Sequence, residues 1–368
     1  MEWGKQLERR SLLRAAGVMG VGAAGLALGG RDMFWPGAAE AEAEAGAGAL
    51  AGDGFDAEPY VDPSLRPFLG AFPPREVGRV YTFDWVREKR GVPADPSAPL
   101  PPGPWRAVKV PVPGGREPVT IYVVNERKGR SRGGIVHMHG GGYLFGSARN
   151  SLAGLAETAR ALDCTLVTVE YRLAPETTYE GSREDTYAAL TWLYRNAAQV
   201  GVDPARIALL GESAGGGHAA LLAITARDRG EVPVAFQCLV YPMLDDRVGA
   251  VIQRPRQMGV YVWTPEENVL GWRSFLGREP GLPDQSDGVP GRVRDVAGLP
   301  PAWIGVGGVD LFLDEDVDYG QRLLDAGIGC EIVVTPGAYH AFDLIAAKSD
   351  LARQFTASKM AALARALG

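Results

Sequence analysis

One serine stands in a pattern that could make it a nucleophile. Ser213 is the centre of Gly211-Glu212-Ser213-Ala214-Gly215, with an apolar run at 206–210 before it and small, helix-compatible residues at 216–223 after it. This order predicts a strand, a tight turn and a helix. So sharp a turn strains its central residue and leaves no room for bulk on either side, which suits the two glycines. The pattern alone is weak, so the nucleophile hypothesis depends on partners elsewhere.

The base that such a serine needs is predicted to be His340. A serine hydroxyl becomes nucleophilic when a base takes its proton, and a carboxylate must hold that base in the right tautomer. The chain has four histidines. Three of them fall in the segment 134–143 or inside the helix after the serine, where they cannot easily reach it. His340 follows the predicted strand 330–334 and so lies at the edge where parallel strands end.

The orienting acid should follow the preceding strand, 302–306, in the chain order serine, acid, histidine. Asp310 comes directly after that strand, and Asp314 is its rival. Asp314 stands where an aspartate would cap the next helix. We therefore predict the triad role for Asp310 and capping for Asp314. Asp316 and Asp318 are predicted to be charges on the surface of that helix.

A glycine loop forms the second motif. The predicted strand 134–138 runs into His139-Gly140-Gly141-Gly142-Tyr143. Three consecutive glycines leave backbone amides unobstructed, so this loop could direct N–H groups at an oxygen that becomes negative during acyl transfer. A plain flexible turn is the alternative. A phosphate loop is disfavoured because the lysine and the serine or threonine of a Walker-type loop are missing.

The elements that position these residues alternate along the chain. A hairpin is predicted from the short runs 107–112 and 119–124, which Pro113-Gly114-Gly115 separates. Further strands are predicted at 134–138, 165–169, 206–210, 235–240, 302–306 and 330–334, and helices at 152–162, 183–198, after Ser213, at about 314–326 and at about 348–367. This alternation predicts an α/β fold with a mainly parallel sheet and helices on both faces.

Two segments interrupt the alternation. Residues 59–104 are rich in proline and aromatic side chains, which suits either short cap helices or an extended arm. Residues 245–300 carry further aromatic residues and then a loop rich in glycine and proline. We therefore predict a linker and N-terminal cap over 46–104, and a catalytic domain over 105–368 with a cap insertion at about 245–300 that lines an apolar pocket.

The first 45 residues are typical of a twin-arginine export signal. Arg9 and Arg10 precede an uncharged run at 15–30, and alternating alanine and glutamate follow at 39–45. A membrane-spanning or amphipathic helix is the alternative, but the run is shorter than the typical span of about 20 residues. We expect segment 1–45 to be removed, the protein to work outside the bacterial cytoplasm, and no stable membrane span to remain.

Charge and cysteine content exclude several classes of function. The formal net charge is −6, which gives no sign of the basic surface that binds nucleic acid, so no nucleic-acid partner is expected. Cys164, Cys238 and Cys330 are widely spaced within apolar runs. This spacing fits neither a metal site nor a disulfide framework, and we predict buried, unpaired side chains.

Taken together, the motifs resemble the hormone-sensitive-lipase family of α/β-hydrolases, which are capped carboxylesterases and lipases. The resemblance runs from about residue 59 to the C-terminus. It rests on His139-Gly140-Gly141-Gly142, on Glu170-Tyr171-Arg172-Leu173-Ala174-Pro175-Glu176, on Gly211-Glu212-Ser213-Ala214-Gly215-Gly216, and on Asp310 and His340 thirty residues apart. Glu170 and Glu212 stand where the family often has aspartate.

The resemblance implies roles for six residues. Ser213 would be the nucleophile, His340 the general base and acid, and Asp310 its orienter. The oxyanion hole would come from the amides of Gly141, Gly142 and Ala214.

The implied activity is hydrolysis of carboxylic esters of small to medium apolar substrates through an acyl-enzyme, with no metal or organic cofactor. An amide, formamide or lactone substrate on the same triad is an alternative. A hydrolase-fold protein that binds a ligand without catalysis is another, and the complete triad disfavours it.

Overall fold

The computed structural model describes residues 54–72, 75–90, 99–284 and 286–368. Its centre is an eight-stranded sheet in the order β1-β2-β4-β3-β5-β6-β7-β8. The predicted hairpin is confirmed, since β1 and β2 are antiparallel, and β2 also pairs antiparallel with β4. All remaining pairs are parallel. The strands are β1 (Trp105–Val112), β2 (Arg116–Val124), β3 (Arg132–Met138), β4 (Thr165–Glu170), β5 (Val202–Glu212), β6 (Phe236–Val240), β7 (Ala302–Gly307) and β8 (Cys330–Thr335).

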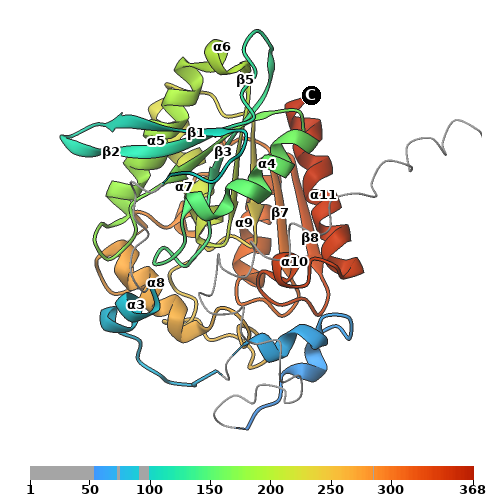
Figure 1. The fold of residues 1–368 in the computed structure, drawn as a ribbon. Coiled ribbons are helices and arrows are strands. Elements are labelled where there is room, and N and C mark those ends of the chain that lie inside the picture. The colour runs from blue at the N-terminus through green and yellow to red at the C-terminus, as the bar shows by residue number, and fades with distance from the viewer. Residues whose placement is uncertain (1–53, 73–74, 91–98, 285) are drawn as a thin grey trace, which may run out of the picture.

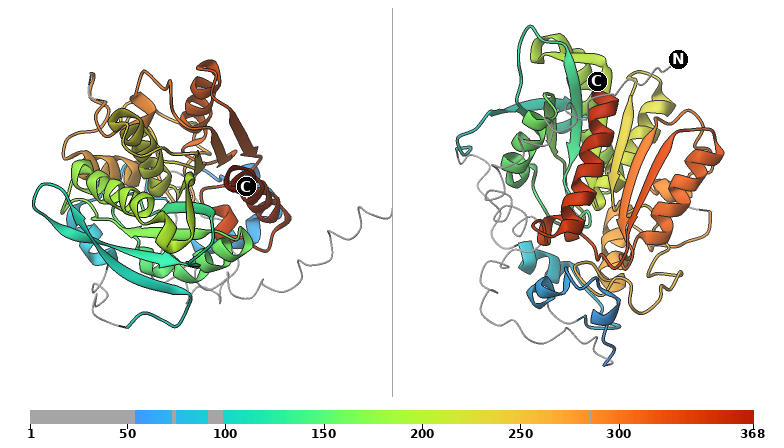
Figure 2. Two further views of the ribbon diagram at one scale, coloured as in Figure 1. Left: turned by 90° about the horizontal axis from the view of Figure 1, so that it is seen from above. Right: turned by 90° about the vertical axis from the view of Figure 1, so that its right-hand side faces the viewer.

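Helices cover both faces of the sheet, as predicted (Figures 1 and 2). Successive strand residues point to opposite faces. Ile135 and Ala208 pack into the core that contains α4 and α11, whereas their neighbours Val136 and Leu209 pack with α5, α7 and α9. The α-helices are α3 (Phe83–Arg90), α4 (Leu152–Ala161), α5 (Tyr179–Arg195), α6 (Ala197–Val200), α7 (Ala214–Arg229), α8 (Pro265–Leu276), α9 (Leu313–Asp325), α10 (Phe342–Ile345) and α11 (Asp350–Leu367), and the 3₁₀ helices are η2 (Glu58–Tyr60), η3 (Arg66–Ala71), η4 (Ala148–Ser151) and η5 (Pro290–Arg292).

Both segments that interrupt the sequence pattern lie beyond the same end of the sheet (Figure 1). The N-terminal segment supplies η2, η3 and α3, and the segment between β6 and β7 supplies α8 and η5. Arg75 and Glu266 join the two segments by a bidentate ion pair with N–O distances of 2.9 and 3.0 Å. The backbone amide of Asp62 ties the N-terminal segment to the core by donating to the carbonyl of Gly337 at 2.9 Å.

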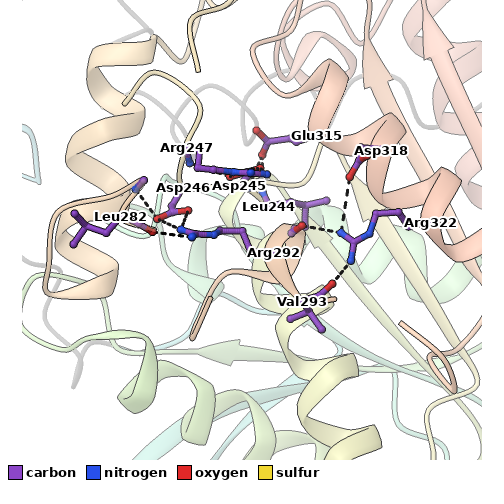
Figure 3. A network of polar contacts seen from close by, with 12 residues as sticks. Leu244, Asp245, Asp246, Arg247, Leu282, Arg292, Val293, Glu315, Asp318 and Arg322 are labelled. Atoms are coloured by element: carbon purple, nitrogen blue, oxygen red, sulfur yellow. Dashed lines mark hydrogen bonds and ion pairs between the residues drawn. The ribbon is translucent and has the colours of Figure 1, made fainter. Parts of the chain in front are cut away.

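Polar contacts pin the start of the second segment to the core (Figure 3). The buried carboxylate of Glu315 on α9 accepts hydrogen bonds from the amides of Leu244, at 2.7 Å, and Asp245, at 3.0 Å. The next residue, Asp246, accepts from Arg292 of η5 at 3.1 Å. The chain that leaves β6 is therefore fixed on two sides before α8 begins.

The prediction that Asp314 caps α9 is wrong. The N-cap position is Phe312, and it makes no side-chain capping bond. Asp310 itself accepts a hydrogen bond from the amide of Phe312, at 3.0 Å, so the chain has already turned when it enters the helix. Asp314 consequently lies inside the first turn, where its exposed side chain pairs with Arg254.

Asp316 is not a surface charge either. Its side chain is fully buried, and neither carboxyl oxygen has a hydrogen-bond partner. The buried face of α9 contains Asp316, Tyr319 and Leu323, which follow one another at helical spacing. The position of Asp316 around the helix axis, and not its residue type, therefore determines its burial. Asp318 is exposed, as predicted, and lies 3.8 Å from Arg322.

The three cysteines are unpaired, as predicted, but only Cys164 and Cys238 are buried, whereas Cys330 is half-buried at the edge strand β8. Within the described residues, no helix combines the length and the apolar character that crossing a bilayer requires. The predicted export signal, residues 1–45, lies outside the described residues.

Candidate active site

The turn between β5 and α7 holds Ser213 in a strained conformation, with φ 57° and ψ −122°. The neighbouring glycines explain how the turn closes. A Cβ atom at Gly211 would overlap the carbonyl oxygen of Gly215, and one at Gly215 would overlap the carbonyl oxygen of Met138 at the end of β3. The Ser213 amide donates to the carbonyl of Val240 on β6 at 2.9 Å. The serine is therefore lifted to the carboxyl edge of the sheet between β3 and β6.

The structure brings the three predicted triad residues together. His340 Nε2 lies 2.9 Å from Ser213 Oγ, and His340 Nδ1 lies 2.8 Å from Asp310 Oδ2. All three side chains are at most 2% exposed. Asp310 follows β7 and His340 follows β8, so adjacent parallel strands deliver the acid and the base to the same edge as the serine.

Aromatic side chains fix the plane of the histidine ring. Tyr241 and Phe312 both meet His340 edge to face, at centroid distances of 4.7 and 5.2 Å. The Tyr241 hydroxyl donates to Asp343 at 2.8 Å, and the ammonium of Lys359 on α11 lies 3.5 Å from that carboxylate. Sequence reasoning missed this support, because nothing in the motifs marks the residue after β6 as a neighbour of the histidine.

The glycine loop follows β3, beside the serine. Gly141 has φ +126° and Gly142 has φ +60°, values that side-chain-bearing residues rarely adopt. Their amides donate to no acceptor among the described residues. Ala214 is the first residue of α7, where backbone amides have no partner within a helix. The three amides predicted to form an oxyanion hole are therefore available as donors.

Hydrogen bonds and stacked rings hold the loop. The carbonyl of Gly141 accepts from the amides of Leu144 and Phe145 at 2.9 and 2.8 Å. His139 stacks on Tyr171, whose hydroxyl donates to the carbonyl of His139 at 2.6 Å. Burial lowers the pKa of His139 to about 4, so this ring is neutral and has a structural place in the loop. These contacts set the path of the loop beside Ser213.

His218, which the sequence excluded as the base, is buried inside α7. Both of its ring nitrogens lack a hydrogen-bond partner, and it contacts Tyr143 and Phe275 edge to face. Burial lowers its pKa to about 3. A neutral ring among aromatic side chains contributes to the packing of α7.

A second buried pair lies beneath the turn and was not predicted. The carboxylate of Glu212 accepts from His137 Nε2 at 2.9 Å, and His137 Nδ1 lies 2.8 Å from the hydroxyl of Thr168. Burial alone raises the pKa of Glu212, but the attraction and the hydrogen bond of His137 outweigh it and hold that pKa below its usual value. A sequence signal existed, since His137 is the one polar side chain in the fully buried strand β3 apart from Arg132.

Among the described residues, no group of three or more histidine, cysteine or acidic side chains is arranged to hold a metal ion.

Comparison with known proteins agrees with this geometry. Residues 135–344 match the family model described as alpha/beta hydrolase fold. The chain is 32% identical over 287 residues to the esterase LipI of Mycobacterium tuberculosis, covering 75% of this chain and 86% of that protein. The chain is a member of the alpha/beta hydrolase family. The predicted resemblance to the hormone-sensitive-lipase branch of these hydrolases is thereby confirmed.

Two further relatives of this hydrolase show the same relationship. It is 35% identical over 242 residues to the carboxylesterase NlhH of Mycobacterium tuberculosis, covering 63% of this chain and 73% of that protein. Among solved structures, a bacterial heroin esterase superposes with a TM-score of 0.73 at 33% identity, over 84% of this chain and 99% of that one. The predicted α/β-hydrolase fold is confirmed over most of the chain.

Proposed function

We propose that the protein hydrolyses carboxylic esters of small to medium apolar substrates by a serine mechanism. The observation that supports this most strongly is the unbroken series Asp310, His340 and Ser213, with contacts of 2.8 and 2.9 Å. The relatives named above are esterases, and their relationship to this chain extends over most of its length.

The steps follow from the geometry. Ser213 Oγ attacks the ester carbonyl carbon while His340 Nε2 takes the hydroxyl proton, and Asp310 holds the imidazole in the tautomer that leaves Nε2 free to accept. The carbonyl oxygen becomes an oxyanion, which the amides of Gly141, Gly142 and Ala214 stabilise. Removing one such donor typically costs about 3 kcal/mol of transition-state stabilisation.

Collapse of this intermediate expels the alcohol, which takes the proton from His340, and leaves the acyl group on the serine oxygen. A water molecule then attacks the acyl carbon while His340 takes one of its protons. The second tetrahedral intermediate releases the carboxylic acid and returns the proton to Ser213.

The apolar substrate preference is supported by the surroundings of the site. The core that contains α8 includes Trp263, Trp272 and Phe275, and the half-buried rings of Tyr81, Trp85 and Phe145 pack against it. Apolar side chains therefore surround the glycine loop on this side, and binding sites with apolar surroundings favour apolar ligands.

Hydrolysis of p-nitrophenyl acetate, butyrate and octanoate by the purified protein tests the proposal. We expect turnover of the shorter esters, and loss of at least about 1,000-fold in kcat for Ser213→Ala, because only a weak background remains without the nucleophile. Equal rates for the wild type and the variant would contradict the serine mechanism. Turnover of p-nitroanilide analogues but not of the esters would show that the protein hydrolyses amides instead.

We further propose that residues 1–45 direct export from the bacterial cytoplasm by the twin-arginine route, which the order of paired arginines, uncharged run and small residues supports. The test is the double substitution Arg9→Lys and Arg10→Lys in a host that has this pathway. We expect esterase activity to disappear from the fraction outside the cytoplasm and to accumulate inside cells. Unchanged activity outside would contradict this route.

A further inference from the structure

Gly142 of the glycine loop is enclosed by two residues of the segment between β6 and β7. A Cβ atom at Gly142 would overlap the six-membered ring of Trp263. A Cβ atom at Gly271, on α8, would lie 2.8 Å from the carbonyl oxygen of Gly142 and 3.3 Å from Cζ2 of Trp263. The loop, the tryptophan and the helix therefore meet at one point with no space for another atom.

The tryptophan ring is itself fixed. Trp263 is 8% exposed, and its indole N–H donates to Oδ1 of Asn268 at 3.0 Å. The side-chain nitrogen Nδ2 of Asn268 donates in turn to the carbonyl of Val248 at 2.9 Å. Thr264, the next residue, begins α8 with a complete capping box to Glu267. The ring cannot swing away from the loop without breaking these bonds.

A fixed ring at this place has a mechanistic consequence. An oxyanion donor acts only when its N–H lies about 3 Å from the position that the oxygen will occupy, so small displacements of the loop reduce catalysis. Gly142 has no side chain to hold its peptide, and a glycine can adopt many backbone conformations besides the φ of +60° found here. Contact with Trp263 on one side and α8 on the other removes that freedom.

We propose that Trp263, together with Gly271, is a positioning residue that sets the Gly142 amide for oxyanion binding. The proposal rests on the serine mechanism proposed above. It assigns to this part of the cap a role in the rate of the chemical step as well as any role in lining the substrate pocket.

The test compares Trp263→Phe and Gly271→Ala with the wild type in kcat and KM for p-nitrophenyl acetate and in the Ki of phenylboronic acid. Boronic acids add reversibly to a serine hydroxyl, and the tetrahedral adduct places an oxygen in the oxyanion hole. We expect kcat to fall about tenfold or more, KM to change less than about twofold, and Ki to rise by the same factor as kcat falls. Gly271→Ala is the sharper variant, because alanine favours a helix and the fold should survive.

Trp303→Phe is the matched control. Trp303 is fully buried on β7, and its indole N–H donates to Ser358 at 3.0 Å, so the variant loses a comparable bond away from the loop. We expect lower stability with unchanged kcat. Higher KM at constant kcat in Trp263→Phe and Gly271→Ala, or an equal fall of kcat in the control, would overturn the proposal while the serine mechanism stands. A wild type without Ser213-dependent turnover would overturn both.

Discussion

Buried carboxyl groups around the site differ in the side chains that contact them. Glu212 has His137 at 2.9 Å, and its pKa lies below the usual value although burial opposes this. Asp316 has no partner, and burial raises its pKa well above the usual value. Glu267 is intermediate, because burial raises its pKa to about 7 although the amide and hydroxyl of Thr264 donate hydrogen bonds to it. The neighbour of each carboxyl, rather than its depth, decides its charge at neutral pH.

Glu267 therefore makes stability depend on pH. A carboxyl whose pKa is 4.5 in the unfolded chain and about 7 in the folded protein stabilises the fold fully below pH 4.5 and loses this contribution as the pH rises to about 7. Glu267→Gln keeps an acceptor for the capping box and removes the titration. We expect the variant to gain about 3 kcal/mol in free energy of unfolding relative to the wild type between pH 4.5 and pH 7. Urea denaturation at half-unit pH intervals measures this difference.

The control for that series is Glu76→Gln. Glu76 is paired with Arg79 at the surface, and its side chain is 62% exposed. The Glu76→Gln variant removes one acidic charge from the same region, but the carboxyl that it removes is exposed and not buried. A pH-dependent difference of the same size in both variants would contradict the assignment of the effect to the buried group.

At the scale of elements, sequence reasoning succeeded where the constraint is local. The turn at Ser213 needs glycine at 211 and 215 because backbone atoms lie where a Cβ would be, so the motif is visible in five residues. The proximity of Asp310 and His340 to Ser213 could be predicted because parallel strands end at one edge of the sheet, so the residues that follow them lie close together. Neither inference requires knowledge of how distant side chains pack.

The same reasoning failed where helical phase or distant packing decides. The acidic side chain of Asp316 predicts a surface position, yet the residue lies on the buried face of α9. The Trp263 contact to Gly142 joins positions 121 residues apart in a segment without a motif, so no local pattern marks it. The division into a cap and a catalytic domain stays a prediction, because composition changes mark its boundaries and nothing more specific does.

At the scale of the whole molecule, the N-terminal segment and the α8 segment are distant in sequence but linked by charge. The Arg75 and Glu266 side chains are 13% and 14% exposed, and the amide of Gly78 also donates to Glu266 at 3.1 Å. Burial raises the pKa of Glu266, but Arg75 and the backbone donors outweigh it and keep that pKa below its usual value. The pair is therefore ionised at neutral pH and largely shielded from solvent.

A double-mutant cycle measures this link. We expect Arg75→Ala and Glu266→Ala to show a coupling free energy of about 1 to 3 kcal/mol in urea denaturation at pH 7, because the pair is bidentate and partly desolvated. The pair formed by Arg79 and Glu76 is the control. Its side chains are 39% and 62% exposed, and a solvent-exposed pair of this kind couples by less than about 1 kcal/mol.

The outcome separates two descriptions of the N-terminal segment. A coupling clearly larger than that of the control pair means that the ion pair helps to hold the segment against α8 and so stabilises the covering of the site. Equal coupling in the two pairs would mean that the segment is held by its other contacts, such as the hydrogen bond from Asp62 to Gly337. In that case removing Arg75 would leave the esterase activity unchanged, because Trp263 would still be held by Asn268, whose side chain donates to the carbonyl of Val248.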